Sequence, residues 1–268
     1  MDGLTRNILN GKPLPLIFML TGPNAIAFTI QAFVNLAEIW LIGTLGTAAL
    51  AAIALSFPFS ILIQTMSLGA LGGGVSSAVA RALGNDDRIR ADKVLWHAIY
   101  LGIVIAGILL ILFWFLGQFA LSFMGGEGAI LEAALGYCTI LFLGGVFLWL
   151  SSLISAIFRG AGDMAYPSRV MIIASVLQIP LTAFFIFGAF GVPALGVPGA
   201  ALSNVVISAG IALAMVLRIK SGKCLVGFRK SSMAIDASVF KEILKVSLPA
   251  TLNPILNVAV ILFFNRTS

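Results

Sequence analysis

Charge is what this sequence has least of. Only 10% of its 268 residues are Asp, Glu, Lys or Arg, whereas 60% are hydrophobic and the mean hydropathy is +1.10. A soluble domain carries about 25% charged residues, so the composition excludes a soluble protein. In a bilayer each crossing needs a helix of about 20 apolar residues, because backbone groups must find their partners within the segment. The sequence therefore predicts an all-α polytopic membrane protein.

Cysteine and histidine are almost as scarce. Two cysteines, Cys138 and Cys224, offer no disulfide framework. The single histidine, His97, has no Cys or Asp cluster around it with metal-ligand spacing, and no phosphate-binding loop or nucleophile elbow occurs. The basic residues are scattered over short loops, with no folded module to present them to nucleic acid. We therefore expect no catalytic residues, no metal site, no cofactor and no nucleic-acid partner, so the protein is not expected to be an enzyme.

Hydropathy divides the chain into six complete spans and a seventh at its end. We expect residues 1–218 to form a six-helix transmembrane bundle, or lobe, and residues 219–239 to connect it to the next span. Residues 240–268 would then be the first helix of a second, incomplete lobe, since secondary transporters are commonly built from repeated halves. On this view the chain is truncated. The predicted spans are 14–43, 48–80, 94–117, 130–158, 165–188, 197–218 and 240–264.

Basic residues gather on one side of these spans. Fifteen of the 16 Lys and Arg residues lie there, and only Arg266 lies at the other end. The segments 43–47, 118–129 and 189–196, which follow spans one, three and five, contain none. By the positive-inside rule the N-terminus and the 219–239 connection are cytoplasmic. The connection is either a short amphipathic piece on the inner membrane surface or a solvated linker with a few buried apolar contacts.

Glu38 is the only charged residue that lies well inside an apolar span. A carboxylate there costs roughly 2.5–3.5 kcal/mol on insertion scales, which makes it a functional-site hypothesis. Asn24, Gln31 and Asn35 share its face, because spacings of 7, 4 and 3 residues keep the four within roughly 60° of one side of a helix. Two other interpretations remain: Glu38 leans toward the outer interface, or it is buried and neutral.

Amides and hydroxyls continue this pattern in other spans. Span two has Ser56, Ser60, Gln64 and Ser67, span five has Ser175, Gln178 and Thr182, and span six has Asn204 and Ser208. Ser and Thr alone often serve helix packing, so the Gln and Asn side chains are the better candidates for lining a cavity. The stripes predict a bundle around a central polar cavity, with Glu38 as its only fixed ionisable group.

Four stretches in the right order resemble motifs of the multidrug and toxic compound extrusion (MATE) family of secondary antiporters. Residues 38–52 (EIWLIGTLGTAALAA) resemble an acid followed by G-x-L-G-x-x-A-L-A-A, and residues 80–86 (ARALGND) resemble A-R-x-L-G-x-G-D. Residues 159–163 (RGAGD) and 196–201 (GVPGAA) resemble R-G-x-G-D and G-v-x-G-A-A. Together the motifs run through almost the whole chain.

The resemblance implies a fold of two six-helix lobes in a V-shaped arrangement, of which this chain would be the N-terminal lobe plus helix seven. Glu38 falls on the position of an acid that takes part in ion coupling or cation binding. Gln31 also falls on a family position, as does Pro23, which allows a helix bend. Many members carry N-x-x-x-D in helix five, where this sequence has Gln178 and Thr182. The second acid of a two-carboxylate site is therefore missing.

The function that the resemblance implies is secondary active antiport, in which organic cations or drugs leave in exchange for H⁺ or Na⁺. The expected ion-coupling and substrate-binding residues are Glu38, Gln31, Asn35, Gln178, Thr182 and Asn204. The expected partners are a small cationic substrate, the lipid bilayer and the missing C-terminal half. We expect an integral protein of a bacterial inner (plasma) membrane.

Two other functions remain as alternatives. One is a lipid-linked flippase of the same superfamily, whose cavity would be more basic. We rank it below the antiporter because the Lys and Arg residues lie between the predicted spans or toward their ends, and none lies in the middle of a span. The other is a truncated membrane fragment without transport activity.

Overall fold

The computed structural model describes residues 13–188, 191, 193–229 and 232–250, with side chains from residue 25 onward. This part of the chain is helical and contains no strand. Its helices are α2 (Pro13–Gly43), α3 (Thr47–Gln64), the π-helical η1 (Thr65–Leu71), α4 (Gly72–Gly84), α5 (Arg88–Phe123), α6 (Gly128–Leu143), α7 (Gly145–Gly160), α8 (Ala165–Phe187) and α9 (Val197–Lys220).

The helices provide six membrane crossings. Five are Ala25–Gly43 in α2, Thr47–Gly84 formed by α3, η1 and α4, and the helices α5, α8 and α9. The pair of α6 and α7 gives the sixth. The prediction of an all-α bundle with six spans is thus confirmed. Residues 237–250 are also helical, and they include the start of the expected seventh span. The remainder of that span lies outside the described residues.

The fourth crossing differs from the single helix expected over 130–158. It consists of α6 and α7, which meet at an angle of 50° at Gly144. A Cβ atom at this position would overlap the side chain of Val205 on α9. Because Gly144 has no side chain, α9 can approach the bend closely. The helix axis changes direction at the consecutive glycines Gly144 and Gly145.

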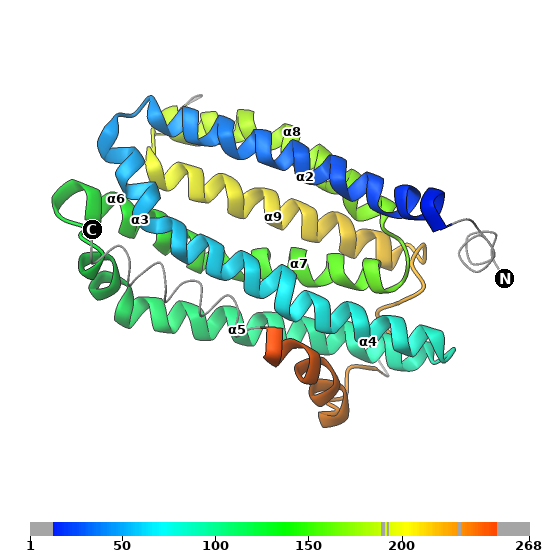
Figure 1. Cartoon of the computed structure of the whole chain (residues 1–268). Coiled ribbons are helices and arrows are strands. Elements are labelled where there is room, and N and C mark those ends of the chain that lie inside the picture. Colours follow the sequence, from blue (N-terminus) through cyan, green and yellow to red (C-terminus); the bar gives the residue numbers. More distant parts are fainter. Residues whose placement is uncertain (1–12, 189–190, 192, 230–231, 251–268) are drawn as a thin grey trace.

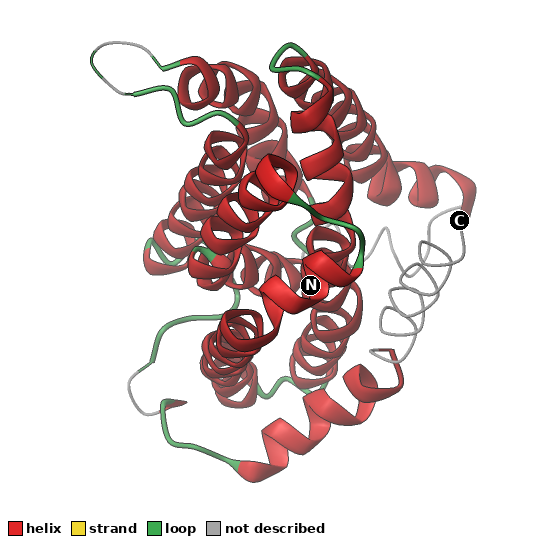
Figure 2. Ribbon diagram, turned by 90° about the vertical axis from the view of Figure 1, so that its left-hand side faces the viewer, coloured by secondary structure: helices red, strands yellow, loops and turns green. Residues whose placement is uncertain are grey.

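The crossings pack side by side around a shared interior (Figures 1 and 2). Helix α2 packs on α8, α8 on α9, and α9 on both α6 and α7, while α7 also contacts α4 and α5. Trp149 and Phe158 of α7 are fully buried at the centre of these contacts. Helix α7 is thus the element around which the others are arranged, and it brings α3, η1 and α4 close to α9.

Large apolar side chains cover the outside of the bundle. Trp40 on α2 is 70% exposed, and Trp114 and Phe115 on α5 are 73% and 76% exposed. In water such a surface would be strongly unfavourable, whereas lipid tails solvate it without cost. The outer faces of α2 and α5 are therefore suited to contact with the bilayer.

The segment after α9 folds back against the ends of α4 and α5 (Figure 1). Glu242 accepts hydrogen bonds in ion pairs with Arg81 at 3.0 Å and Arg90 at 2.7 Å. In the connection before it, Val226 is buried and the Phe228 ring lies edge-on to Trp96, with centroids 5.5 Å apart. These contacts hold the connection against the bundle.

His97 and Asp236 add a second attachment point. The buried His97 ring contacts the Lys93 carbonyl through Nδ1 at 2.7 Å, and its Nε2 accepts a hydrogen bond from the backbone N–H of Asp236 at 2.8 Å. The Asp236 carboxylate accepts hydrogen bonds from Ser238 and from the Lys93 ammonium, and these hold its pKa well below the usual range. Both ring nitrogens of His97 are thus occupied in holding the connection.

Candidate functional site

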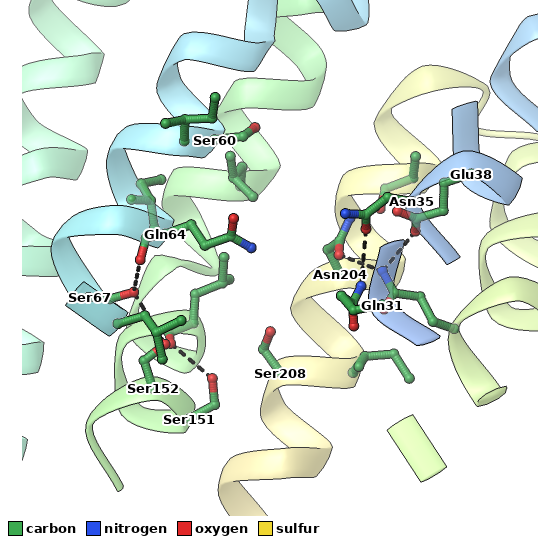
Figure 3. Close-up of a pocket in the computed structure, with 18 of the residues that line it drawn as sticks. Gln31, Asn35, Glu38, Ser60, Gln64, Ser67, Ser151, Ser152, Asn204 and Ser208 are labelled. Atoms are coloured by element: carbon green, nitrogen blue, oxygen red, sulfur yellow. Dashed lines mark hydrogen bonds between the residues drawn. The ribbon is translucent and has the colours of Figure 1, made fainter. Parts of the chain in front are cut away.

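A cavity of about 350 Å³ lies between the crossings. Residues of α2, α3, η1, α6, α7, α8 and α9 line it, so it is the place where most of the bundle meets. The polar stripes predicted from the sequence converge on this space (Figure 3). Its walls also carry apolar side chains such as Ile39, Phe57 and Leu148. The cavity is thus a largely apolar container with a few polar groups, as is typical of small-molecule sites.

Glu38 of α2 lies at one wall of this cavity. Its Oε1 accepts two hydrogen bonds from α8, one from Gln178 Nε2 at 2.8 Å and one from Thr182 Oγ1 at 3.0 Å. Gln178 and Thr182 are four residues apart, so they lie on the same face of α8. None of the residues that the structure describes donates a hydrogen bond to Oε2 of Glu38. That oxygen is therefore free to take a proton or a cation.

The network continues into α9. Gln178 Nε2 also donates to Asn204 Oδ1 at 2.7 Å, and Thr182 Oγ1 lies 2.7 Å from Ser203 Oγ. Ser203 Oγ in turn lies 2.8 Å from the Ala200 carbonyl. Each hydroxyl has one proton to donate, so two arrangements are consistent with these distances.

The two arrangements fit different protonation states of the carboxyl group. When Glu38 is ionised, or carries its proton on Oε2, Thr182 donates to Oε1 and Ser203 donates to Thr182. When the proton lies on Oε1, Glu38 donates to Thr182, which turns its own proton to Ser203, and Ser203 donates to the Ala200 carbonyl. The same side chains can therefore satisfy hydrogen bonds in either state of Glu38, without a change of backbone.

The inner part of the α2 stripe also contacts α8. Gln31 Oε1 accepts a hydrogen bond from Ser175 Oγ at 2.9 Å, and Gln31 Nε2 donates to Asn35 Oδ1 at 3.1 Å. Both α2 side chains line the cavity. The six polar residues expected to bind ion or substrate thus lie in one continuous region, although their role in transport stays a prediction. The side chains of Asn24 and Pro23 lie outside the described residues.

The sequence and structure both match known transporters. The MatE family model matches residues 23–184, which is more than half of the chain. The chain belongs to the MATE family.

Relatives of this MATE chain include a probable multidrug resistance protein and an FAD transporter. Over 260 residues it is 28% identical to the probable multidrug resistance protein YoeA of Bacillus subtilis, covering 91% of this chain and 54% of that protein. Over 183 residues it is 30% identical to an FAD transporter of Shewanella oneidensis, covering 68% of this chain and 40% of that protein. The chain spans about half the length of the curated relatives it matches.

Solved MATE structures share the fold. The outward-facing conformation of a multidrug resistance MATE family transporter of the MOP superfamily matches with a TM-score of 0.86 and 28% identity, over 98% of this chain and 57% of that one. An inward-facing conformation matches with a TM-score of 0.79 and 29% identity, over 88% of this chain and 53% of that one. This part of the fold is therefore that of MATE transporters, whose family is not one of enzymes.

The carboxylate of Glu38 is held by neutral side chains of α8. Gln178 and Thr182, the positions where the motif resemblance leads one to expect an Asn and an Asp, both donate hydrogen bonds to Glu38. These neutral donors hold a single carboxylate, with no second carboxylate among their hydrogen-bond partners in the described residues. The Glu38 site can then be neutralised by one proton or one monovalent cation at a time.

The expectation that Glu38 is the only fixed ionisable group of the cavity is wrong. Arg159, in the last turn of α7, lines the same cavity. Hydropathy placed this residue one position beyond the end of span four, whereas α7 continues to Gly160. The argument against a flippase, that no Arg or Lys lies in the middle of a span, is weakened accordingly, although the guanidinium shares the cavity with a carboxylate.

Proposed function

We propose that this chain is one lobe of a secondary active antiporter that exports organic cations or drugs in exchange for H⁺ or Na⁺. The observation that carries the proposal is the placement of Glu38, which lines a largely apolar cavity while its Oε1 is held by Gln178 and Thr182. An ionisable group inside a membrane bundle marks an ion or substrate pathway.

Coupling follows from competition for one carboxylate. A proton or Na⁺ that occupies Glu38 neutralises it, so an organic cation is no longer attracted. When the ion leaves, the ionised group attracts the cation through a medium of low dielectric, in which charge interactions are strong. Because the hydroxyls of Thr182 and Ser203 can reorient, the network stabilises both states. No cofactor enters this scheme.

The proposal also includes a second lobe, a bacterial inner membrane and an orientation in that membrane. A second lobe completes the cavity, in keeping with relatives about twice as long. The protein resides in a bacterial inner membrane, with the N-terminus and the 219–239 connection in the cytoplasm, because the basic residues lie on that side.

The test is export of ethidium, a fluorescent organic cation, by membrane vesicles that contain the complete protein, under a pH gradient or a Na⁺ gradient imposed separately. We expect Glu38→Gln to abolish gradient-driven export, since the amide cannot exchange a proton or bind the cation electrostatically. The matched control is Glu132→Gln on α6, which removes an exposed carboxylate that does not line the cavity and should leave export unchanged. Retained export by a normally inserted Glu38→Gln variant would contradict the proposal.

A further inference from the structure

The cavity has a second polar wall, which faces the Glu38 network from the side of α3, η1 and α7 (Figure 3). Ser67 Oγ lies 3.2 Å from Ser152 Oγ and donates to the Gln64 carbonyl at 3.2 Å. The side chains of Gln64 and Ser151 border the same space. All of these groups are neutral and can donate hydrogen bonds into the cavity.

Arg159 supplies this wall with a positive charge that no acid neutralises. Four ion pairs link described residues, and none of them includes Arg159. The acid nearest in sequence, Asp163, accepts a hydrogen bond from the backbone N–H of Tyr166 at 3.1 Å and so caps the start of α8. Arg159 is half-buried and lines the cavity, and its nitrogens are not among the fully buried, unpaired atoms of the described residues. The guanidinium is therefore accessible from the cavity, where its N–H groups can donate to a ligand.

The backbone of Gly72, at the junction of η1 and α4, lies next to Arg159. A Cβ atom on Gly72 would be in van der Waals contact with Arg159 Nη2 at 3.4 Å, and closer, at 3.0 Å, to the Ser67 carbonyl oxygen. Gly72 directly follows the π-helical segment Thr65–Leu71, a distortion that often occurs at functional sites. Ser67 in the same segment contacts Ser152. The guanidinium thus lies beside the π-helical segment that carries one of the wall's hydroxyls.

We propose that Arg159, with Gln64, Ser67 and Ser152, forms a subsite for an oxyanion, a carboxylate or phosphate group, of the transported molecule. This inference rests on the proposed function, in which Glu38 takes the cationic group of the same molecule. The planar guanidinium matches carboxylate and phosphate oxygens with paired N–H donors, and the hydroxyls complete the set. The two walls together would bind a zwitterionic substrate across the cavity.

The experiment compares two dyes that differ in one group. Rhodamine B is a zwitterion, and its ethyl ester has the same cationic ring system without the carboxylate. Their dissociation constants are measured by fluorescence polarisation for the purified complete protein and for Arg159→Gln. We expect the wild-type protein to bind the zwitterion about tenfold more tightly than the ester, as a charge-assisted contact would provide. In Arg159→Gln this preference should disappear through loss of zwitterion affinity alone.

Three controls make the result specific. Arg169→Gln removes an exposed basic residue at the start of α8, outside the cavity, and should keep the preference. Glu38→Gln should weaken both dyes and keep their ratio, so failure of the proposed function is distinguishable from failure of the oxyanion subsite. Ser152→Ala is a smaller change that can be measured even if Arg159→Gln does not fold. It should reduce, but not abolish, the preference for the zwitterionic dye over its ester. Acetate and inorganic phosphate added as competitors show which oxyanion the subsite prefers.

Three results would overturn the inference. Equal affinities of both dyes for the wild-type protein would mean that Arg159 contacts no anionic group of the ligand. An equal loss of affinity for both dyes in Arg159→Gln, or a loss of thermal stability with the dye preference intact, would mean that the guanidinium supports the fold or pairs with an acid elsewhere in the protein.

Discussion

Glu38 is held by neutral donors from a single neighbouring helix. The Gln178 amide and the Thr182 hydroxyl both reach its Oε1, and both are themselves held by α9 through Asn204 and Ser203. Hydrogen bonds to a charged group contribute about 1.5–3 kcal/mol each. Two such bonds are together of the same order as the cost of placing a carboxylate in the membrane, roughly 2.5–3.5 kcal/mol. The ionised state of Glu38 is thus tolerable at this position.

The Thr182 hydroxyl can be removed with little change of shape. Thr182→Val keeps the volume of this fully buried side chain but deletes the donor to Glu38 and the partner of Ser203. We expect the concentration of coupling ion needed for half-maximal export to change by about tenfold, because a charge-assisted bond is lost. Initial export rates at graded ion concentrations measure this.

Thr182→Ser, which keeps the hydroxyl, is the matched control and should behave almost as wild type. If Thr182→Val and Thr182→Ser need the same ion concentration for half-maximal export, the Thr182 hydroxyl does not hold the Glu38 carboxylate.

The Glu38 wall and the Gln64 and Ser67 side chains of the opposite wall could be predicted from the sequence, whereas the position of Arg159 could not. Residues spaced 3, 4 and 7 apart on an apolar helix must share a face, and a carboxylate among them cannot face lipid. Arg159 lies at the end of its span, where an arginine normally extends toward the interface. Only the packing of α7 at the bundle centre, with Gly72 opposite, turns this side chain into the cavity. Such placement depends on tertiary contacts that hydropathy does not contain.

At the scale of elements, two crossings that line the cavity depart from a regular α-helix. The π-helical η1 interrupts the second crossing, and the 50° angle at Gly144 divides the fourth. The number of crossings follows from the lengths of the apolar runs, so it was predictable. The two irregularities were not, because the choice between α- and π-type hydrogen bonding and the close approach of Val205 to Gly144 depend on neighbouring helices.

Gly144 should tolerate no side chain. In Gly144→Ala the added Cβ would overlap Val205, so α9 would have to shift, and we expect a loss of about 1–3 kcal/mol in stability from overpacking. Gly145→Ala is the matched control, since nothing lies within 4 Å of a Cβ placed there. Thermal unfolding of both purified variants measures the difference, and equal midpoints would show that the close approach to Val205 has no structural importance.

At the scale of the whole molecule, the bundle reverses the arrangement of a soluble protein. Its outer faces carry Trp40, Trp114 and Phe115, and most charges of the described residues lie in the cavity or at the end where α4 ends and α5 begins, apart from Glu127 and Glu132 near the start of α6. The membership in the MATE family and the helical architecture follow from motifs and hydropathy together. The division into a lobe at 1–218, a connection and a second lobe stays a prediction, as does the identity of the coupling ion.

The central claim is that one carboxylate binds either the coupling ion or the cationic substrate. It is tested most directly by adding tetraphenylphosphonium, a permanent organic cation, to the purified complete protein and measuring the ions released. A pH indicator reports protons, and radiolabelled Na⁺ bound beforehand reports sodium. We predict that the wild-type protein releases an ion for each organic cation bound, and that Glu38→Gln releases none. Cation binding without ion release in the wild type, or the same release from Glu38→Gln, would contradict the account.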